Sequence, residues 1–206
     1  MIELFLSAFV TLFVVIDAPG CAPIFYGLTT DASAAQRRRM AIRAVVIAAG
    51  ILVGFGAFGE DLLRALGISL AAFRIAGGIM LFVIAMDMVF EKRTQRREDR
   101  AQKVKDKPQI EDVSVFPMAM PMIAGPGSIA TVMLLMARAQ GLEASLIVLA
   151  ALAANLLLML GALLAIGPIM RVAGDQVEAV ITRLLGVILA ALAVQFVLDG
   201  LDGSIL

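Results

Sequence analysis

Asp17 is the residue whose position most directly predicts chemistry. It is the one acidic residue between Glu3 and Asp31, and it lies inside an apolar run long enough to cross a bilayer. A carboxylate at that depth is costly, and ionisable residues kept inside membranes are usually functional. We therefore expect Asp17 to bind a substrate ammonium, to carry a coupling proton, or to pair with an arginine.

The residues after Asp17 predict a break in the helix. Pro19, Gly20 and Pro23 lie within five residues of one another. Each proline removes a backbone donor and clashes with the preceding turn, and glycine adds flexibility. Backbone groups near such a break lose their helical partners, so amides can bind an anion and carbonyls a cation.

A second stretch, residues 123–131, repeats this pattern. An offset of 107 residues aligns Pro126 with Pro19. The residues that follow also align: Gly127 with Gly20, and Ser128 with Cys21. Matching breaks in two segments favour a binding site, although kinks that serve close helix packing are the simpler alternative.

Apolar runs of spanning length predict six transmembrane helices. They cover roughly residues 3–28, 41–58, 66–90, 113–137, 144–170 and 180–198. A charged stretch, 91–112, separates two halves, 1–90 and 113–206, and an odd number of spans in each half predicts opposite orientations in the membrane. Arg74 and Arg183, which match at an offset of 109, extend the repeat. The predicted fold is all-α: two inverted three-helix repeats, with the first and fourth helices broken at mid-membrane.

The distribution of basic residues predicts the orientation. Most of the 17 Lys and Arg residues fall on one side, in the connections at 37–43, 91–112 and 171–183. The positive-inside rule then places the charged 91–112 loop in the cytoplasm and both termini outside.

Composition excludes several classes of function. The chain is 61% hydrophobic with a formal net charge of zero, so nothing favours a nucleic-acid partner. It has no histidine and one cysteine, which removes the commonest general base, the commonest zinc ligand and any internal disulfide. We expect no enzymatic activity, no metal site and no cofactor.

Four motifs carry a resemblance to a known family: Asp17–Phe25, Phe73–Gly78, Ala124–Gly127 and Gly186–Gly200. They resemble the MarC family of six-span bacterial inner-membrane proteins over essentially the whole chain. That family usually has Pro directly after the Asp and a polar amide at the position of Cys21, whereas this chain has Ala18 and Cys21. The family is similar to lysine-exporter-superfamily proteins, and the resemblance implies transport of small neutral amino acids such as glycine and alanine.

The candidate residues fall into two groups. The predicted substrate-binding residues are Asp17, Gly20, Cys21, Gly125, Gly127, Ser128 and Asn155. Arg74 and Arg183 are predicted to gate the two sides or to hold a carboxylate, with snorkelling as the alternative. Asp17 and Arg183 lie at comparable depth and could form an ion pair. Interhelical hydrogen bonding explains Asn155, Ser128 and Thr131 equally well, and Cys21 is readily explained as a packing residue.

The sequence therefore predicts a secondary transporter in the bilayer, with a small neutral amino acid as substrate and a proton or sodium as coupling ion. A non-transporting scaffold or regulatory membrane protein and a passive channel are the alternatives. The sequence makes no prediction of an oligomer.

Overall fold

A computed structural model describes residues 1–90, 112–172 and 175–205 of the chain. These residues form helices joined by short turns, and the described part contains no strand. Five helices are long and apolar enough to cross a membrane, and one bent pair makes a sixth if it counts as one span. The prediction of an all-helical, multi-span protein is confirmed.

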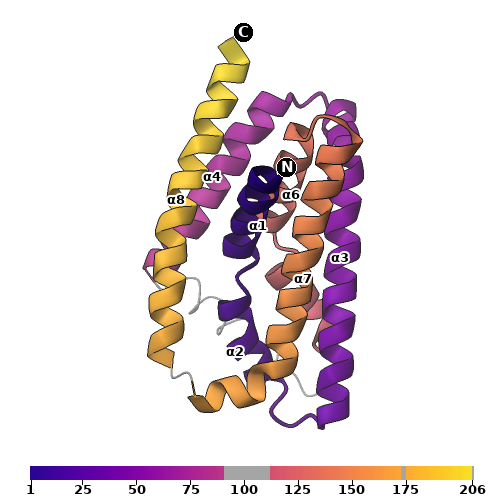
Figure 1. The fold of residues 1–206 in the computed structure, drawn as a ribbon, viewed down its shortest axis with the longest axis vertical. Helices are drawn as coiled ribbons and strands as arrows, with labels where there is room; N and C mark the ends of the chain where they lie inside the picture. The colour runs from indigo at the N-terminus through magenta and orange to yellow at the C-terminus, as the bar shows by residue number, and fades with distance from the viewer. Residues whose placement is uncertain (91–111, 173–174, 206) are drawn as a thin grey trace.

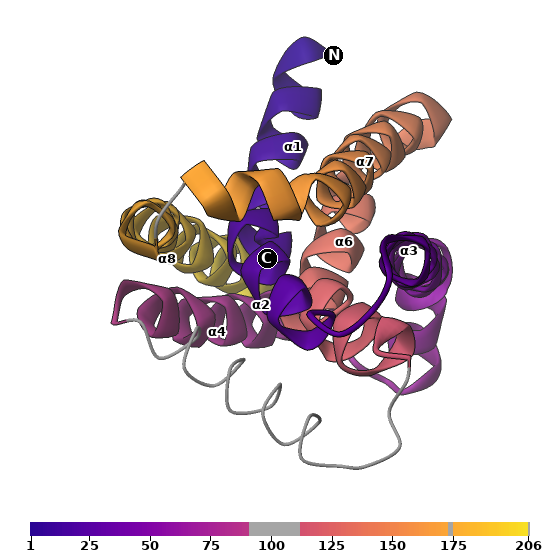
Figure 2. The same cartoon turned by 90° about the horizontal axis from the view of Figure 1, so that it is seen from below.

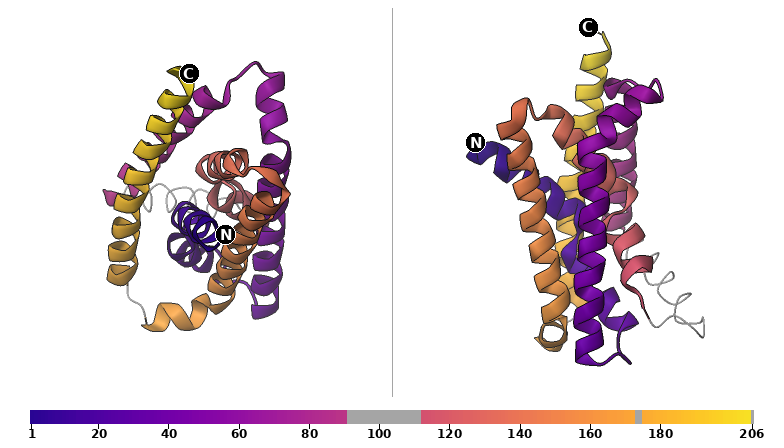
Figure 3. Two further views of the ribbon diagram at one scale, coloured as in Figure 1. Left: turned by 45° about the horizontal axis from the view of Figure 1, so that its top comes forward. Right: turned by 90° about the vertical axis from the view of Figure 1, so that its right-hand side faces the viewer.

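The elements follow one another in the order shown in Figure 1. They are α1 (Ile2–Ile16), α2 (Ala18–Leu28), α3 (Ala34–Ala65), α4 (Leu70–Val89), η1 (Ser114–Ile123), α6 (Pro126–Arg138), α7 (Gly141–Val172) and α8 (Asp175–Ile205). The α1–α2 segment lies between the α4–α8 pair and α3, as the view from below shows (Figure 2). Viewed obliquely, α1 and α6 lie inside a frame formed by α3, α4, α7 and α8 (Figure 3).

Helix α1 contributes to both hydrophobic cores because opposite faces of it are buried. Leu12 and Ile16 belong to a core shared with α2, α3, η1 and α7. Val14 and Val15 belong to a second core with α4, α6 and α8. The first span, made of α1 and α2, is accordingly 56% buried, against 39% or less for the spans in α3, α4, α7 and α8.

Side-chain caps determine where α3 and α4 begin. Ser33 accepts a hydrogen bond from the amide of Gln36, whose side chain accepts one from the amide of Ser33. This reciprocal arrangement satisfies two amides that helix formation leaves without partners. Ser69 caps α4 through the amide of Ala72, and Gly67 makes the preceding turn with a φ of +71°.

Helices α4 and α8 are in close contact because glycines face backbone across the interface. A Cβ on Gly78 would lie 2.7 Å from the carbonyl oxygen of Ala193 and 2.7 Å from Cγ2 of Val197. A Cβ on Gly186 would lie 3.1 Å from the carbonyl oxygen of Ala85. Small residues allow such approach between membrane helices, where packing rather than water drives association.

These contacts are reciprocal between the two helices. Two of the three nearest atoms are of the same kind at each glycine: a carbonyl oxygen of alanine and a Cγ2 of valine. An offset of 108 relates the three pairs of residues, Gly78 and Gly186, Ala85 and Ala193, and Val89 and Val197. This register differs by one residue from the offset that aligns Arg74 with Arg183 in the sequence.

Of the charged stretch 91–112, Asp112 alone lies within the described residues. Its carboxylate forms an ion pair with Arg43 of α3 and accepts a hydrogen bond of 2.9 Å from the amide of Ser114. Burial raises the pKa of Asp112, but the Ser114 hydrogen bonds and the Arg43 charge outweigh it, so the pKa is below its ordinary value. Asp112 thus ties the start of η1 to α3.

Candidate functional site: two broken helices

Asp17 is the single residue at which the first span breaks. Helix α1 ends at Ile16 and α2 begins at Ala18, while Asp17 adopts a left-handed conformation with φ 56° and ψ 64°. No other non-glycine residue in the described ranges has a positive φ. Aspartate and asparagine tolerate this conformation better than other non-glycine residues. Asp17 is also buried, with 1% of its surface exposed.

Asp17 also caps the helix that follows it. Its Oδ1 accepts a hydrogen bond of 3.2 Å from the amide of Gly20, and its carbonyl accepts one of 3.0 Å from the amide of Cys21. A carboxylate at a helix N-terminus satisfies an unpaired amide and interacts favourably with the helix dipole. The Gly20 amide, a predicted anion ligand, is therefore already bonded to Asp17.

The second break is wider than the sequence predicts. Prolines at 117 and 121 force the preceding residues, Phe116 and Met120, into extended conformations with ψ near 128° and 127°. The irregular segment η1 therefore begins at Ser114, well before the glycines. A bend of 54° separates η1 from α6.

Gly125 immediately precedes α6, at its N-cap position, and has no side chain with which to cap it. A Cβ at Gly125 would lie 2.5 Å from the carbonyl oxygen of Pro121, so the bend requires glycine there. Helix α6 has no side-chain cap, and its first turn contains the buried residues Gly127 and Ser128. Their amides point out of the positive end of the helix dipole, which suits an anion.

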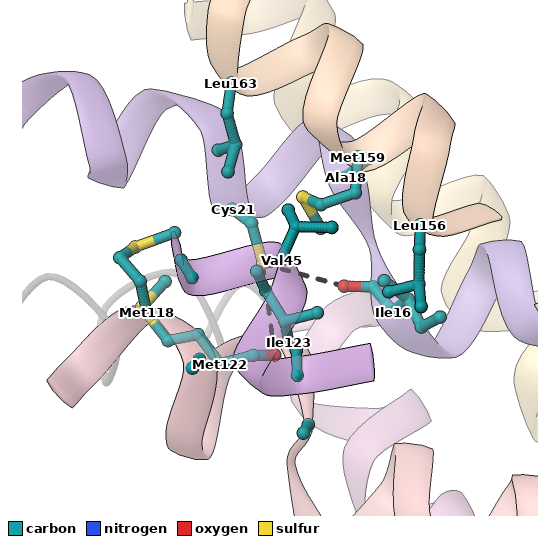
Figure 4. Packing of buried hydrophobic residues seen from close by; sticks show 14 of the residues in the cluster. Ile16, Ala18, Cys21, Val45, Met118, Met122, Ile123, Leu156, Met159 and Leu163 are labelled. Carbon is teal, nitrogen blue, oxygen red and sulfur yellow. Dashed lines mark hydrogen bonds between the residues drawn. The ribbon is translucent and has the colours of Figure 1, made fainter. Parts of the chain in front are cut away.

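Cys21 connects the two breaks. Its Sγ lies 3.6 Å from the carbonyl oxygen of Ile16 and 4.0 Å from that of Met122 in η1 (Figure 4). The thiol is 0% exposed and packs with apolar side chains that include Met159 of α7. These contacts agree with Cys21 as a packing residue, and its predicted contact with substrate stays a prediction.

Gly127 lies against α1 and α4. A Cβ there would meet Ile84 Cδ1 at 2.6 Å, Leu81 Cδ2 at 3.5 Å and Val15 Cγ1 at 3.5 Å. Together with the Cys21 contact, this places the start of α6 beside the end of α1. The structure thus brings the two broken stretches into contact, although they are about 100 residues apart in the chain.

Asn155 lies on α7 and contacts α1 well before the Asp17 break. Its Nδ2 donates to the carbonyl oxygens of Phe9, at 3.1 Å, and Ala151, at 2.9 Å, and the residue is 2% exposed. Phe9 precedes Asp17 by about two helical turns. Of the two sequence interpretations, the contacts favour interhelical hydrogen bonding. Thr131 is fully buried, and its hydroxyl has no hydrogen-bond partner among the described residues.

The two predicted gating arginines lie in different environments. Arg74 has a buried Nε without a hydrogen-bond partner in the part of the chain described. Arg183 of α8 has an exposed side chain, whereas Asp17 is buried. The ion pair between Asp17 and Arg183 stays a prediction.

A polar contact between α6 and α8 was not predicted from the sequence. Arg138, the last residue of α6, forms an ion pair with Asp199 of α8 and lies over the ring of Phe196 at 4.7 Å. Each of these charges ends an otherwise apolar run, which is the one signal in the sequence that could have suggested the pair.

Apolar helices of spanning length, together with buried polar residues at helix breaks, define a multi-pass integral membrane protein. A family model described as "MarC family integral membrane protein" matches residues 2–205. The chain belongs to the MarC family, as its motifs predict.

Curated relatives agree with this assignment. A UPF0056 membrane protein of Methanocaldococcus jannaschii is 34% identical over 205 residues, covering 100% of this chain and 99% of the relative. YvbG of Bacillus subtilis is 35% identical, covering 98% and 96%, and YhcE of Escherichia coli is 31% identical, covering 95% and 90%. Both are also named UPF0056 membrane proteins, and the names state no substrate. No solved structure matches the chain.

Proposed function

We propose that this protein is a secondary transporter of small neutral amino acids, with its binding site between the two broken helices. It acts as a carrier and not as an enzyme. The strongest support is the position of Asp17, a buried carboxylate in a left-handed conformation at a helix break. The residues that follow it contact the second break through Cys21 and Met122.

The chemistry of the two breaks suits the two ends of a zwitterion. Asp17 supplies a negative charge for the substrate ammonium. The uncapped first turn of α6, at Gly127 and Ser128, supplies amide donors for the substrate carboxylate. Because Asp17 already accepts from Gly20, we assign the carboxylate to α6 rather than to α2.

We further propose that the two halves are inverted repeats whose breaks lie at mid-membrane. The reciprocal contacts of Gly78 and Gly186, related by an offset of 108, support this arrangement. The starts of α2 and α6, at Ala18 and Pro126, differ by the same offset. Transporters built from inverted repeats alternate access by moving one repeat against the other around a central site.

Counterflow in proteoliposomes tests the transport proposal. Vesicles preloaded with glycine or alanine should take up labelled glycine and alanine, while lysine and glutamate should not compete. Imposed proton and sodium gradients, tested separately, identify the coupling ion. Absence of exchange for every neutral amino acid would leave a scaffold or regulatory role, and ion conductance without counterflow would indicate a channel.

Asp17→Asn tests the site itself. Asparagine keeps the size, the left-handed tendency and a capping oxygen, but removes the charge. We expect normal insertion, loss of most amino-acid binding, and residual transport that no longer responds to a pH gradient. Wild-type affinity in Asp17→Asn, with unfolding in Arg183→Ala, would instead make Asp17 half of a structural ion pair.

The proposed orientation places both termini outside and the 91–112 loop in the cytoplasm, supported by the clustering of basic residues. A reporter active only in the cytoplasm, fused after the C-terminus, should be inactive. The same reporter inserted in the loop should be active. The opposite pattern of activity would show that the protein has the reverse orientation.

A further inference from the structure

Two arginines and one aspartate converge where α4, α6 and α8 meet near the C-terminal end of the chain. We name Arg74, Arg138 and Asp199 the arginine cluster. Arg74 lies in the early part of α4, Arg138 ends α6, and Asp199 lies near the end of α8. Figure 1 shows the beginning of α4 and the last turns of α8 side by side at this end of the molecule.

Arg138 and Asp199 form the paired part of the cluster. The ion pair between them is partly shielded, with side-chain exposures of 35% and 27%. Phe196 lies beneath the guanidinium at 4.7 Å, and Gln195 donates a hydrogen bond of 2.7 Å to Asp199. Both oxygens of Asp199 are therefore engaged.

Arg74 forms the unpaired part of the cluster. Its Nε is buried without a hydrogen-bond partner, and no carboxylate among the described residues lies within ion-pairing distance. Its Nη1 lies 3.9 Å from a Cβ built on Gly203, one turn beyond Asp199 on the same face of α8. The charge of Arg74 also acts on Arg138. A partly buried guanidinium with unused donors is costly unless an acceptor satisfies it.

The charges in the cluster do not balance. The cluster holds two guanidinium groups and one carboxylate, which pairs with Arg138. Asp202, the next acid on α8, is exposed and forms no ion pair within the described residues. Glu60 and Asp61 at the end of α3 both pair with Arg64. One added monoanion would neutralise the cluster and satisfy the donors of Arg74.

We propose that the arginine cluster binds a single oxyanion, a carboxylate or a phosphate, between Arg74 and Arg138. The planar fork of each guanidinium suits two-oxygen acceptors of this kind. Asp199 then acts as an internal competitor that holds Arg138 while the site is empty. The anion could be a free solute or the phosphate of a lipid headgroup, and its binding is independent of the proposed transport.

Calorimetric titration of the full-length protein in phosphatidylcholine nanodiscs tests this proposal, first with acetate and then with inorganic phosphate. Neither measurement requires transport, so a failure here is distinct from a failure of amino-acid counterflow. We expect saturable binding of one anion per chain. Arg74→Gln should weaken it about tenfold or more, since a charge-assisted hydrogen bond is lost.

The variant Asp199→Asn separates a binding site from a merely structural ion pair. Removal of the competing carboxylate should tighten acetate binding several-fold, whereas a structural pair predicts no gain. Arg64→Gln is the matched control because Arg64 is an exposed arginine with its own acidic partners, and it should leave binding unchanged. If Arg74→Gln does not fold, Arg74→Lys replaces it in the test. Lysine keeps the charge but lacks the planar fork, so anion affinity should again be lower than in the wild type.

Anionic nanodiscs identify the source of the oxyanion. If a lipid phosphate occupies the site, phosphatidylglycerol should abolish acetate binding, and the purified wild-type protein should retain more anionic lipid than Arg74→Gln. If the ligand is a free solute, acetate binding should be equal in both kinds of nanodisc. No anion binding together with equal lipid retention would overturn the proposal, as would binding that is unchanged in Arg74→Gln.

Discussion

The two helix breaks differ in what maintains them. At the α1–α2 break, one residue leaves the helical conformation, and its carboxylate caps the helix that follows. At the η1–α6 break, an irregular proline-rich segment leads into a 54° bend, and the helix that follows has no side-chain cap because a glycine precedes it. A single side chain maintains the first break, whereas backbone geometry maintains the second. One break therefore presents a buried carboxyl group and the other presents backbone donors.

The largest effect is expected from Gly125→Ala, because the second break depends on close backbone approach. The added Cβ would lie 2.5 Å from the carbonyl oxygen of Pro121, so the backbone at the bend must shift. We expect a loss of about 3 kcal/mol or more of stability, or failure to insert. Denaturation in detergent, with yield from the membrane fraction, measures it.

Gly27→Ala is the matched control for that variant, since nothing lies within 4 Å of a Cβ at Gly27 in α2. It should leave stability unchanged or raise it by up to about 1 kcal/mol. Equal stability of Gly125→Ala and Gly27→Ala would show that the second break does not depend on the glycine.

The next effect concerns the cap at the first break. Asp17→Ala removes both the capping oxygen and the side chain that tolerates a left-handed backbone, so it should lose about 1–2 kcal/mol relative to Asp17→Asn. Parallel denaturation of the two variants measures the difference. If both variants lose the same amount, the charge and not the cap stabilises the break.

Cys21 tests how closely the two breaks pack. Cys21→Ala should cost about 1 kcal/mol because a small buried group is lost at the α2–η1 contact. A membrane-permeant maleimide should not label wild-type Cys21 in the native protein and should label it after denaturation, since the thiol is 0% exposed. Rapid native labelling would mean that the two breaks separate in the resting protein.

Asp112 gives the smallest effect, because it holds the start of η1 from outside the membrane. The pKa of Asp112 is lower in the folded state than in the unfolded state. Its contribution to the free energy of unfolding is therefore complete above the unfolded pKa of about 3.9, and it is lost as the pH falls from there through the folded pKa. Asp112→Asn should therefore cost less than about 1 kcal/mol at pH 7, since the pair is exposed.

Denaturation of wild type and Asp112→Asn at pH 7 and pH 3 checks this sign. The difference in stability should be present at pH 7, smaller at pH 3, and reduced by salt at pH 7. A difference that grows at low pH would contradict the assignment.

Much of the fold could be predicted from the sequence because the signals are local. Spans follow from the length of apolar runs, since a bilayer demands a minimum hydrophobic length. The break at Asp17 follows from Pro19, because proline cannot donate a hydrogen bond within a helix. The same motifs predicted the family, which the comparisons confirm.

Other features depend on contacts between segments distant in the chain. The sequence aligns Pro19 with Pro126 and so suggests two equivalent breaks, yet only the three-dimensional arrangement shows Asp17 bonded to Gly20 and α6 without a side-chain cap. In the sequence alone, Asn155 could equally line a cavity or bond to another helix. The structure shows its side chain donating a hydrogen bond to the carbonyl oxygen of Phe9.

The sequence by itself determined which segments are apolar and long enough to cross a membrane, where proline and glycine interrupt them, and that Asp17 lies inside such an apolar run. These properties depend on hydrophobic length and on covalent backbone constraints, which act within a few residues. The tertiary structure decided the register of α4 against α8 and the meeting of Arg138 with Asp199. Such contacts join residues on separate helices, and their geometry exists only once the helices pack.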